Sequence, residues 1–259
     1  MRTIDIGIDK IDKIYHIADV HVRNVKRHKE YQLVFKRLYS YIKKTKTDNS
    51  VIYVAGDIVH AKTDMSPELV AIVSDFFRQL ANLCPTLIIT GNHDCNLNNS
   101  YRLDALTPIV KALNHQNIHY LKDNGIYLIS GVHFNVLSVF DKPVDYIKAD
   151  DFEGDYKIAL HHGSVHNAST DAGFTLSNTH VTTEMFKGHD LSLLGDIHKP
   201  QFLDEEKTMA YAGSLIQQNH GEGLTHGIMV WDLETRKSEF VEITNDYGYY
   251  TFHIDEGKI

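Results

Sequence analysis

Short hydrophobic runs alternate with longer amphipathic segments through the first half of this chain. The runs 13–19, 51–57 and 86–94 have the length and composition of buried strands. The segments 27–46 and 66–83 have helical periodicity, and the second opens with a serine followed by proline, which is a typical helix start. This alternation predicts βαβ units and therefore an α/β fold.

The second half is predicted to be mostly strands. After a helix near 102–113, residues 125–140 are expected to form paired antiparallel strands, and the tail from about 207 an antiparallel run. The segment 163–181 is polar and long for a loop, so it is either functional or a disordered insertion. No repeat or linker divides the sequence, and we expect a single domain over 1–259.

Composition limits the function classes. The chain is 42% hydrophobic and 23% charged, as in ordinary soluble proteins. No apolar run approaches the ~20 residues of a membrane span, and the N-terminus lacks the apolar core of a signal peptide. Cys84 and Cys95 give no disulfide framework, so we expect a cytoplasmic protein, or a nuclear one in a eukaryote, that is neither secreted nor membrane-bound. The net charge of −8 argues mildly against a generic nucleic-acid coat, which would be basic.

Polar side chains follow five of the predicted strands. In "VIYVAGDIVHA" (51–61) and again in "LSLLGDIHKPQ" (191–201), an apolar run stops at Gly-Asp and a histidine follows. Residues beyond the carboxyl ends of strands in an α/β sheet converge on one crevice, so we expect one shared site. Its candidate members are Asp19 and His21; Asp57 and His60; Asn92, His93 and Asp94; His161 and His162; Asp196 and His198.

The donor types indicate a metal site. Oxygen and imidazole donors without thiolates suit Mn²⁺, Fe²⁺, Zn²⁺ or Mg²⁺. The glycines before Asp57, Asn92 and Asp196 are expected to let the backbone turn sharply and come close to an ion. Each motif alone has an ordinary explanation, such as a capping aspartate, a turn or a packed histidine pair. Five of them in one chain favour the metal site.

In this order the segments resemble the calcineurin-type metallophosphoesterase signature, D-x-H … G-D-x-x … G-N-H-D/E … H … G-H-x-H. The variants "GDIVH", "HHG" and "GDIHKPQ", followed by "YAGSL", are most similar to the Mre11/SbcD nucleases, and the resemblance spans roughly 14–232. It implies a four-layer α/β/β/α sandwich with mixed sheets. It also implies an enzyme with two divalent ions, Mn²⁺ being the first choice and Mg²⁺, Fe²⁺ or Zn²⁺ the alternatives.

The resemblance also implies roles by position. One ion would be held by Asp19, His21, Asp57 and His198, and the second by Asp57, Asn92, His161 and Asp196. His93 would approach the scissile phosphate, oriented by Asp94, and His60 matches a histidine with which family nucleases handle the DNA end. Two metal ions ~4 Å apart can clamp a phosphodiester and activate a water.

One position departs from the family pattern, which has histidine where this chain has Asp196. Three aspartates contribute −3 against +4 from two divalent ions, which leaves +1, whereas histidine at 196 would leave +2. We expect Asp196 to remain a ligand in a site tilted toward harder ions such as Mn²⁺ or Mg²⁺. The alternative is a decayed site that binds one ion or none.

The resemblance further implies a DNA exo/endonuclease acting in end processing, repair or recombination. Its partners would be DNA, an SMC-like (Rad50/SbcC-type) ATPase and a second copy of the chain in a homodimer. Alternatives are a phosphomonoesterase or cyclic-nucleotide phosphodiesterase, and a non-catalytic binding module. Arg23, Arg27 and Arg102 are candidate phosphate contacts, although a solvated helix start explains the first two equally well. Because the chain ends about where such a nuclease core ends, we expect the capping and ATPase-binding regions to be absent.

Overall fold

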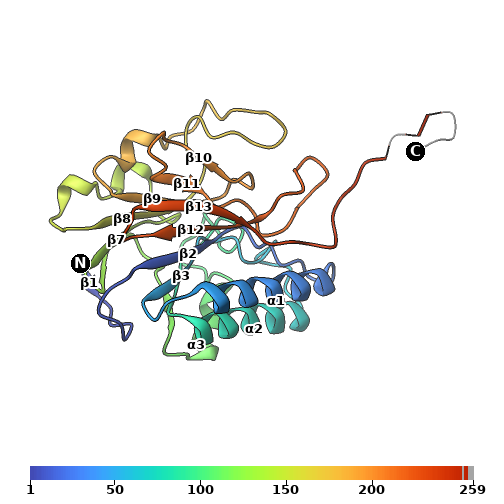
Figure 1. Cartoon of the computed structure of the whole chain (residues 1–259), viewed down its shortest axis with the longest axis horizontal. Coiled ribbons are helices and arrows are strands. Elements are labelled where there is room, and N and C mark those ends of the chain that lie inside the picture. The colour runs from blue at the N-terminus through green and yellow to red at the C-terminus, as the bar shows by residue number, and fades with distance from the viewer. Residues whose placement is uncertain (253, 256–259) are drawn as a thin grey trace.

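The protein is built from two mixed β-sheets stacked face to face, as seen in the computed structural model, which describes residues 1–252 and 254–255 (Figure 1). In the first sheet β2 to β5 run parallel, and β12 and β13 extend it by antiparallel pairing. Its order is β13 (Lys237–Glu242), β12 (Gly227–Asp232), β2 (Lys13–Ile17), β3 (Ser50–Val54), β4 (Thr86–Ile88) and β5 (Ile118–Tyr120).

The second sheet has seven strands, of which β7, β8, β9 and β11 run parallel. Strands β6 and β7 form the antiparallel pair expected within 125–140. The order is β1 (Arg2–Thr3), β6 (Gly125–Ile129), β7 (Val132–Leu137), β8 (Lys157–His162), β9 (Leu191–Gly195), β11 (Met209–Tyr211) and β10 (Gln201–Phe202).

Three helices lie together on one side of the first sheet (Figure 1). They are α1 (His28–Thr45), α2 (Pro67–Leu83) and α3 (Leu106–Leu113). In α1 the buried residues Tyr31, Val34, Phe35, Leu38 and Ile42 recur at helical spacing, so one apolar stripe faces the sheet. Helix α2 starts as its sequence predicts, because the Ser66 side chain accepts a hydrogen bond from Leu69 N and proline occupies the first position.

Hydrophobic side chains fill three layers. One cluster lies between the helices and the first sheet, and a second between the two sheets, where Trp231, Tyr53 and Phe134 are fully buried. A third covers the outer face of the second sheet, where Val165 and Phe186 pack. The expected four-layer sandwich is confirmed, although short 3₁₀ helices and the segment 163–181 supply the outer cover in place of long helices.

The tail is more complex than a single antiparallel run. Strand β11 pairs in parallel with β9 in the second sheet, whereas β12 and β13 pair antiparallel in the first. Within the described residues, no helix combines the length and apolar character needed to cross the membrane.

Candidate metal centre

Both sheets deliver polar side chains to one place. Asp19, Asp57 and Asn92 follow β2, β3 and β4 of the first sheet, and the residues that meet them end or follow β8 and β9 of the second. The backbone N–H of Asp196 donates to both oxygens of Asp19 at 3.1 Å, which joins the two sheets. The predicted convergence of strand ends therefore occurs.

A first donor group lies at the ends of β2 and β9. The Nε2 atoms of His21 and His198 are 3.0 Å apart, and His21 Nε2 is 3.5 Å from Asp57 Oδ2. Donor atoms of Asp19, His21 and His198 all lie within 4.8 Å of one another. Together with Asp57, they are the four residues that the family resemblance assigns to the first ion.

A second donor group shares Asp57 with the first. His162 Nε2 lies 3.3 Å from Asp57 Oδ1, 3.1 Å from Asn92 Oδ1 and 3.8 Å from Asp196 Oδ1. The Ser164 hydroxyl donates to Asp196 Oδ2 at 2.6 Å, so the other oxygen of that carboxylate faces His162. Asp196 thus lies inside the site, as expected of a ligand.

The assignment of His161 to the second donor group is wrong, and His162 takes its place. Side chains alternate between the two faces of a strand, so neighbouring residues of β8 point in opposite directions. The His161 ring packs beside Tyr146 and Phe186 on the outer face of the sheet, and its Nδ1 is 3.0 Å from the carbonyl of Leu137.

Four of the ligand candidates have a strained backbone. Asp19, His21, Asp57 and Asp196 have φ values of 50°, 49°, 52° and 101°, in the left-handed region that non-glycine residues seldom adopt. Such conformations persist where surrounding structure imposes them, and they cluster at functional sites.

The glycines before Asp57, Asn92 and Asp196 allow close packing at the centre. A Cβ at Gly91 would collide with the Asp57 carboxylate, and one at Gly195 would collide with the Ala55 carbonyl. At Gly56 a Cβ would lie 2.5 Å from Gly91 N and 2.8 Å from His162 Nδ1. These residues are glycines because the strand ends from both sheets approach one another here.

Burial and neighbouring charges set the protonation of the metal-free site. Desolvation raises the pKa of Asp19 to about 7. Burial alone would lower the pKa of His162, but the carboxylates of Asp57, Asp19 and Asp196 outweigh it and raise that pKa. Burial raises the pKa of Asp57, yet His162 and His21 together bring it below its usual value. One imidazolium thus offsets part of a carboxylate cluster.

The donor set fits divalent cations. Within the described residues, no lysine or arginine pairs with Asp19, Asp57 or Asp196, although all three carboxylates are largely buried. His162 donates its Nδ1–H to the Ala55 carbonyl, which leaves the Nε2 lone pair for a cation. One ion would be held by Asp19, His21, Asp57 and His198, and a second by Asp57, Asn92, His162 and Asp196.

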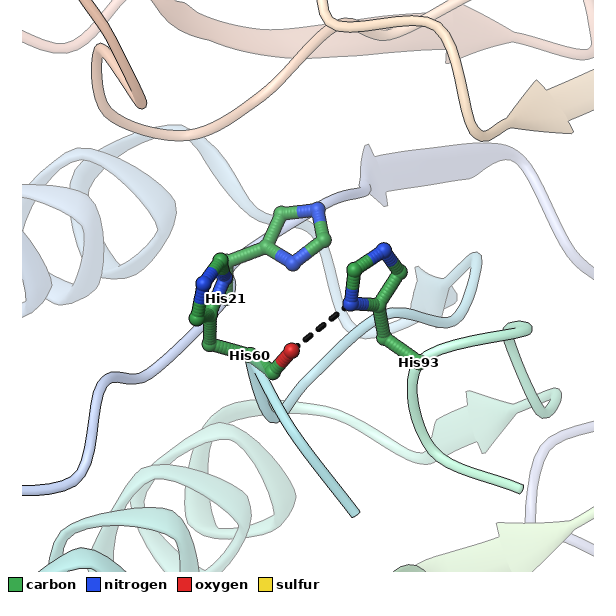
Figure 2. Close-up of side chains that lie close together, drawn as sticks. All are labelled: His21, His60 and His93. Atoms are coloured by element: carbon green, nitrogen blue, oxygen red, sulfur yellow. Dashed lines mark hydrogen bonds between the residues drawn. The ribbon is translucent and has the colours of Figure 1, made fainter. Parts of the chain in front are cut away.

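Two further histidines lie next to the metal ligands. The rings of His21, His60 and His93 come from three separate segments and surround one space, with centroids 4.8 to 5.7 Å apart (Figure 2). His93 Nδ1 lies 2.7 Å from the backbone carbonyl of His60, so it donates its proton there (Figure 2). His60 Nε2 lies 3.2 Å from the Arg23 guanidinium, which can only donate, so the proton of the His60 ring is on Nδ1.

Asp94 does not orient His93, contrary to expectation. Its carboxylate accepts backbone N–H groups of Ile58, Val59 and Gly91 at 2.9 to 3.0 Å and is fully buried. These bonds tie the turn after β3 to the turn after β4. Asp94 therefore shapes the backbone of the site rather than its reacting groups.

The three candidate arginines differ in position. Arg23 lies beside the site, between His60 and the Gln218 carbonyl. The Arg27 guanidinium binds Glu30 through two hydrogen bonds of 2.7 Å and stacks on Tyr249, which favours the ordinary helix-start interpretation. Arg102 is exposed on the segment that follows the "GNHD" turn.

One functional candidate was missed by the sequence reasoning. Glu222 Oε1 lies 2.8 Å from His198 Nδ1, across 24 residues of sequence. Both side chains line a cavity of about 230 Å³, whose wall also includes Thr170 and Asp171 from the long polar segment. No motif marks Glu222, because it follows no strand end.

The family to which the chain belongs was sought by comparison with known proteins. Residues 12–200 match the model of the calcineurin-like phosphoesterase family. The chain is 45% identical over 272 residues to "Uncharacterized protein R555" of Acanthamoeba polyphaga mimivirus, and the match covers 100% of this chain but 20% of that protein. The chain thus spans about a fifth of that relative's length. The crystal structure of Pseudomonas putida nuclease MPE is 17% identical, with 58% of each chain covered and a TM-score of 0.31.

Proposed function

Because the chain belongs to the calcineurin-like phosphoesterase family, we propose that it is a Mn²⁺-dependent DNA exo/endonuclease of the Mre11/SbcD type, acting on DNA ends. The family and the donor clusters indicate a metal-dependent hydrolase. The finer assignment rests on one observation: two donor groups share Asp57, and His60 and His93 lie beside them.

Each residue around the donor groups has a defined part in this proposal. Two divalent cations, when bound, would polarise the phosphoryl oxygens and supply a nucleophile near neutral pH. His93 keeps Nε2 for the substrate because Nδ1 is committed to the His60 carbonyl. The Nδ1–H of His60 is buried and has no partner in the described part of the chain, so the ring would have to move before a phosphate oxygen could accept from it.

Basic side chains surround the two donor groups, which favours a substrate whose phosphodiester belongs to a longer nucleic-acid strand. Arg23 lies beside His60, and Lys62 donates to the backbone carbonyl of Asn92 at 3.1 Å. On the other side of the ligands, Lys199 lines the cavity next to His198. Flanking phosphates of DNA can contact such groups without any base being read. An SMC-like ATPase and a second copy of the chain are the proposed partners.

The test is hydrolysis of linear duplex DNA with Mn²⁺, beside a small chromogenic phosphodiester, a phosphomonoester and a cyclic nucleotide. We expect degradation of DNA, and none with an Asp57→Asn variant, which lacks the shared carboxylate. If a small ester is hydrolysed while the DNA stays intact, the nuclease proposal is wrong and the protein is a phosphomonoesterase or a cyclic-nucleotide phosphodiesterase. Two bound Mn²⁺ ions without turnover of any substrate would indicate a binding module.

A further inference from the structure

Glu222 contacts a metal-ligand candidate from a loop outside every strand end. The contact joins Oε1 to His198 Nδ1 at 2.8 Å, and the Glu222 side chain is only 6% exposed. The Nε2 atom of the same imidazole is 3.0 Å from His21 Nε2. The carboxylate therefore lies behind the ring, on the side away from the first donor group.

We propose that Glu222 is a positioning residue for His198, which it holds with the proton on Nδ1 and the Nε2 lone pair directed at the ion bound by Asp19, His21 and Asp57. A carboxylate behind a ligating histidine fixes its tautomer and orientation and makes the ring a better ligand. The inference rests on the proposed function only in requiring that a cation binds there.

The Glu222 carboxylate is itself held in place. Oε2 accepts the backbone N–H of Gln218 at 2.6 Å, and Oε1 also accepts the Asn219 side-chain amide at 2.7 Å. Both oxygens are thus fixed before His198 is considered. An ion-pair partner with so little freedom loses little entropy when it orients the ring.

The loop that presents Glu222 is anchored to the C-terminal segment. Gln217 Nε2 donates to the Glu222 backbone carbonyl at 3.0 Å, and Gln217 Oε1 accepts the backbone N–H of Tyr249 at 2.6 Å. The Tyr249 ring in turn packs against His220 and the Arg27 guanidinium. Segments far apart in the sequence therefore cooperate to place one carboxylate.

Glu222 also changes the charge balance of the site. The aspartates at 19, 57 and 196 contribute −3, and Glu222 adds −1, which together equal the +4 of two divalent ions. A fourth negative charge next to the first ion stabilises the metal-bound state. Its loss should lower the affinity for the first ion more than the affinity for the second.

The experiment measures Mn²⁺ binding by calorimetry, without substrate, for the wild type, Glu222→Gln and Glu222→Ala. Glu222→Gln keeps the shape of the side chain and one hydrogen-bond acceptor, so we expect it to lower the affinity for the first ion by about 10-fold. Glu222→Ala should lower that affinity by up to about 100-fold. The second ion should keep its affinity in both. Glu205→Gln is the matched control, because it removes an exposed carboxylate from the turn between β10 and β11.

The outcomes separate positioning from a merely structural role. If Glu222 only supports its loop, both variants will lower the unfolding temperature of the metal-free protein while binding two Mn²⁺ ions as tightly as wild type, which overturns the inference. If the wild type cleaves no phosphoester but Glu222→Gln still weakens one ion, the proposed function falls and the positioning role is supported. If the wild type cleaves DNA while the variants bind Mn²⁺ normally, the positioning role alone falls.

Discussion

His162 Nε2 lies 3.3 Å from Asp57 Oδ1, while the ring of the preceding residue, His161, lies on the opposite face of strand β8. The two histidines have the same chemistry and adjacent positions. Their different surroundings follow from the alternation of side chains along an extended strand. His162 is therefore expected to bind metal, and His161 to stabilise the fold.

Replacement of each histidine by alanine tests this division. His162→Ala should reduce the Mn²⁺ stoichiometry from two to one and lower hydrolysis by at least ~100-fold, since loss of a ligand costs no less than loss of its supporting partner. His161→Ala should keep both ions but lower the free energy of unfolding by about 1–3 kcal/mol, because it removes buried packing against Phe186. Calorimetry and urea denaturation measure these effects. An ion lost from His161→Ala would reverse the assignment.

Much of the site could be predicted because strand ends are visible in sequence. Apolar runs that stop at Ala-Asp, at Gly-Asp or at Gly-Asn-His-Asp locate Asp19, Asp57, Asn92 and Asp196, and parallel strands bring such ends together. The choice between His161 and His162 depended on which face of β8 points inward. A single-residue shift exchanges the two faces, and the apolar run 158–160 before the histidines has no polar–apolar alternation that would fix the choice.

Other features depend on contacts that no local pattern encodes. Glu222 reaches His198 because its loop is held by Gln217, which binds the backbone of Tyr249. The parallel pairing of β11 with β9 places a strand from the tail in the second sheet. Such contacts are decided by packing of the whole chain rather than by the residues of one segment.

The contribution of Asp19 to the stability of the metal-free protein should fall as the pH rises from about 4 to about 7. Burial raises the pKa of Asp19 from 3.8 to about 7, so in this window the folded state binds a proton that the unfolded state has lost. The raised pKa of His162 acts in the same direction at higher pH, because its stabilising proton is lost as the pH passes that value. Urea denaturation of the wild type and Asp19→Asn at pH 5 and pH 8, in the presence of a chelator, isolates this contribution. The comparison is needed because buried histidines such as His16 and His161, with pKa values lowered to about 3 and about 4, change the stability in the opposite direction.

Asp19→Asn separates stability from metal binding. The variant should be more stable than wild type at pH 8 without metal, because a buried carboxylate no longer has to ionise, and it should bind Mn²⁺ poorly. In the wild type, Mn²⁺ affinity should increase through about pH 7 as Asp19 loses its proton, and further as His162, whose pKa is also raised, loses its own. A variant that is less stable than wild type at pH 8 would show that the Asp19 carboxylate is not destabilised by burial.

Asp196 is expected to be a true ligand of the second ion. Asp196→Ala should therefore bind one Mn²⁺ instead of two. Asp196→His should keep two ions but shift the preference from Mn²⁺ and Mg²⁺ toward Zn²⁺, because imidazole replaces a hard oxygen donor. The hydrogen bond from Ser164 to Asp196 Oδ2 is lost in both variants, so Ser164→Ala is the control that isolates that bond. Two ions of unchanged affinity in Asp196→Ala would contradict the assignment.

Asp94 and His93 should respond differently to mutation although they are neighbours. Both oxygens of the Asp94 carboxylate accept backbone N–H groups, three in all. Asp94→Asn replaces one oxygen by an NH₂ group, which cannot accept, so it should lower the free energy of unfolding by about 1–3 kcal/mol. His93→Ala should leave the free energy of unfolding nearly unchanged but lower the hydrolysis rate by ~100-fold or more, as loss of a proton-transfer group does. Thermal unfolding and single-turnover hydrolysis distinguish the two. Equal losses of stability would assign His93 a structural role as well.

Gly91→Ala tests whether close packing of the strand ends is required to hold the shared carboxylate. The added Cβ would collide with the Asp57 carboxylate and its backbone nitrogen, so Asp57 must move away from both donor groups. We expect loss of both Mn²⁺ ions and a loss of stability of about 1–3 kcal/mol from overpacking. Gly223→Ala is the control, because its Cβ would lie 3.7 Å from Asp171 Oδ1, an ordinary contact. Calorimetry with Mn²⁺ decides the case: if Gly91→Ala still binds two ions, Asp57 does not need its observed position to bridge them.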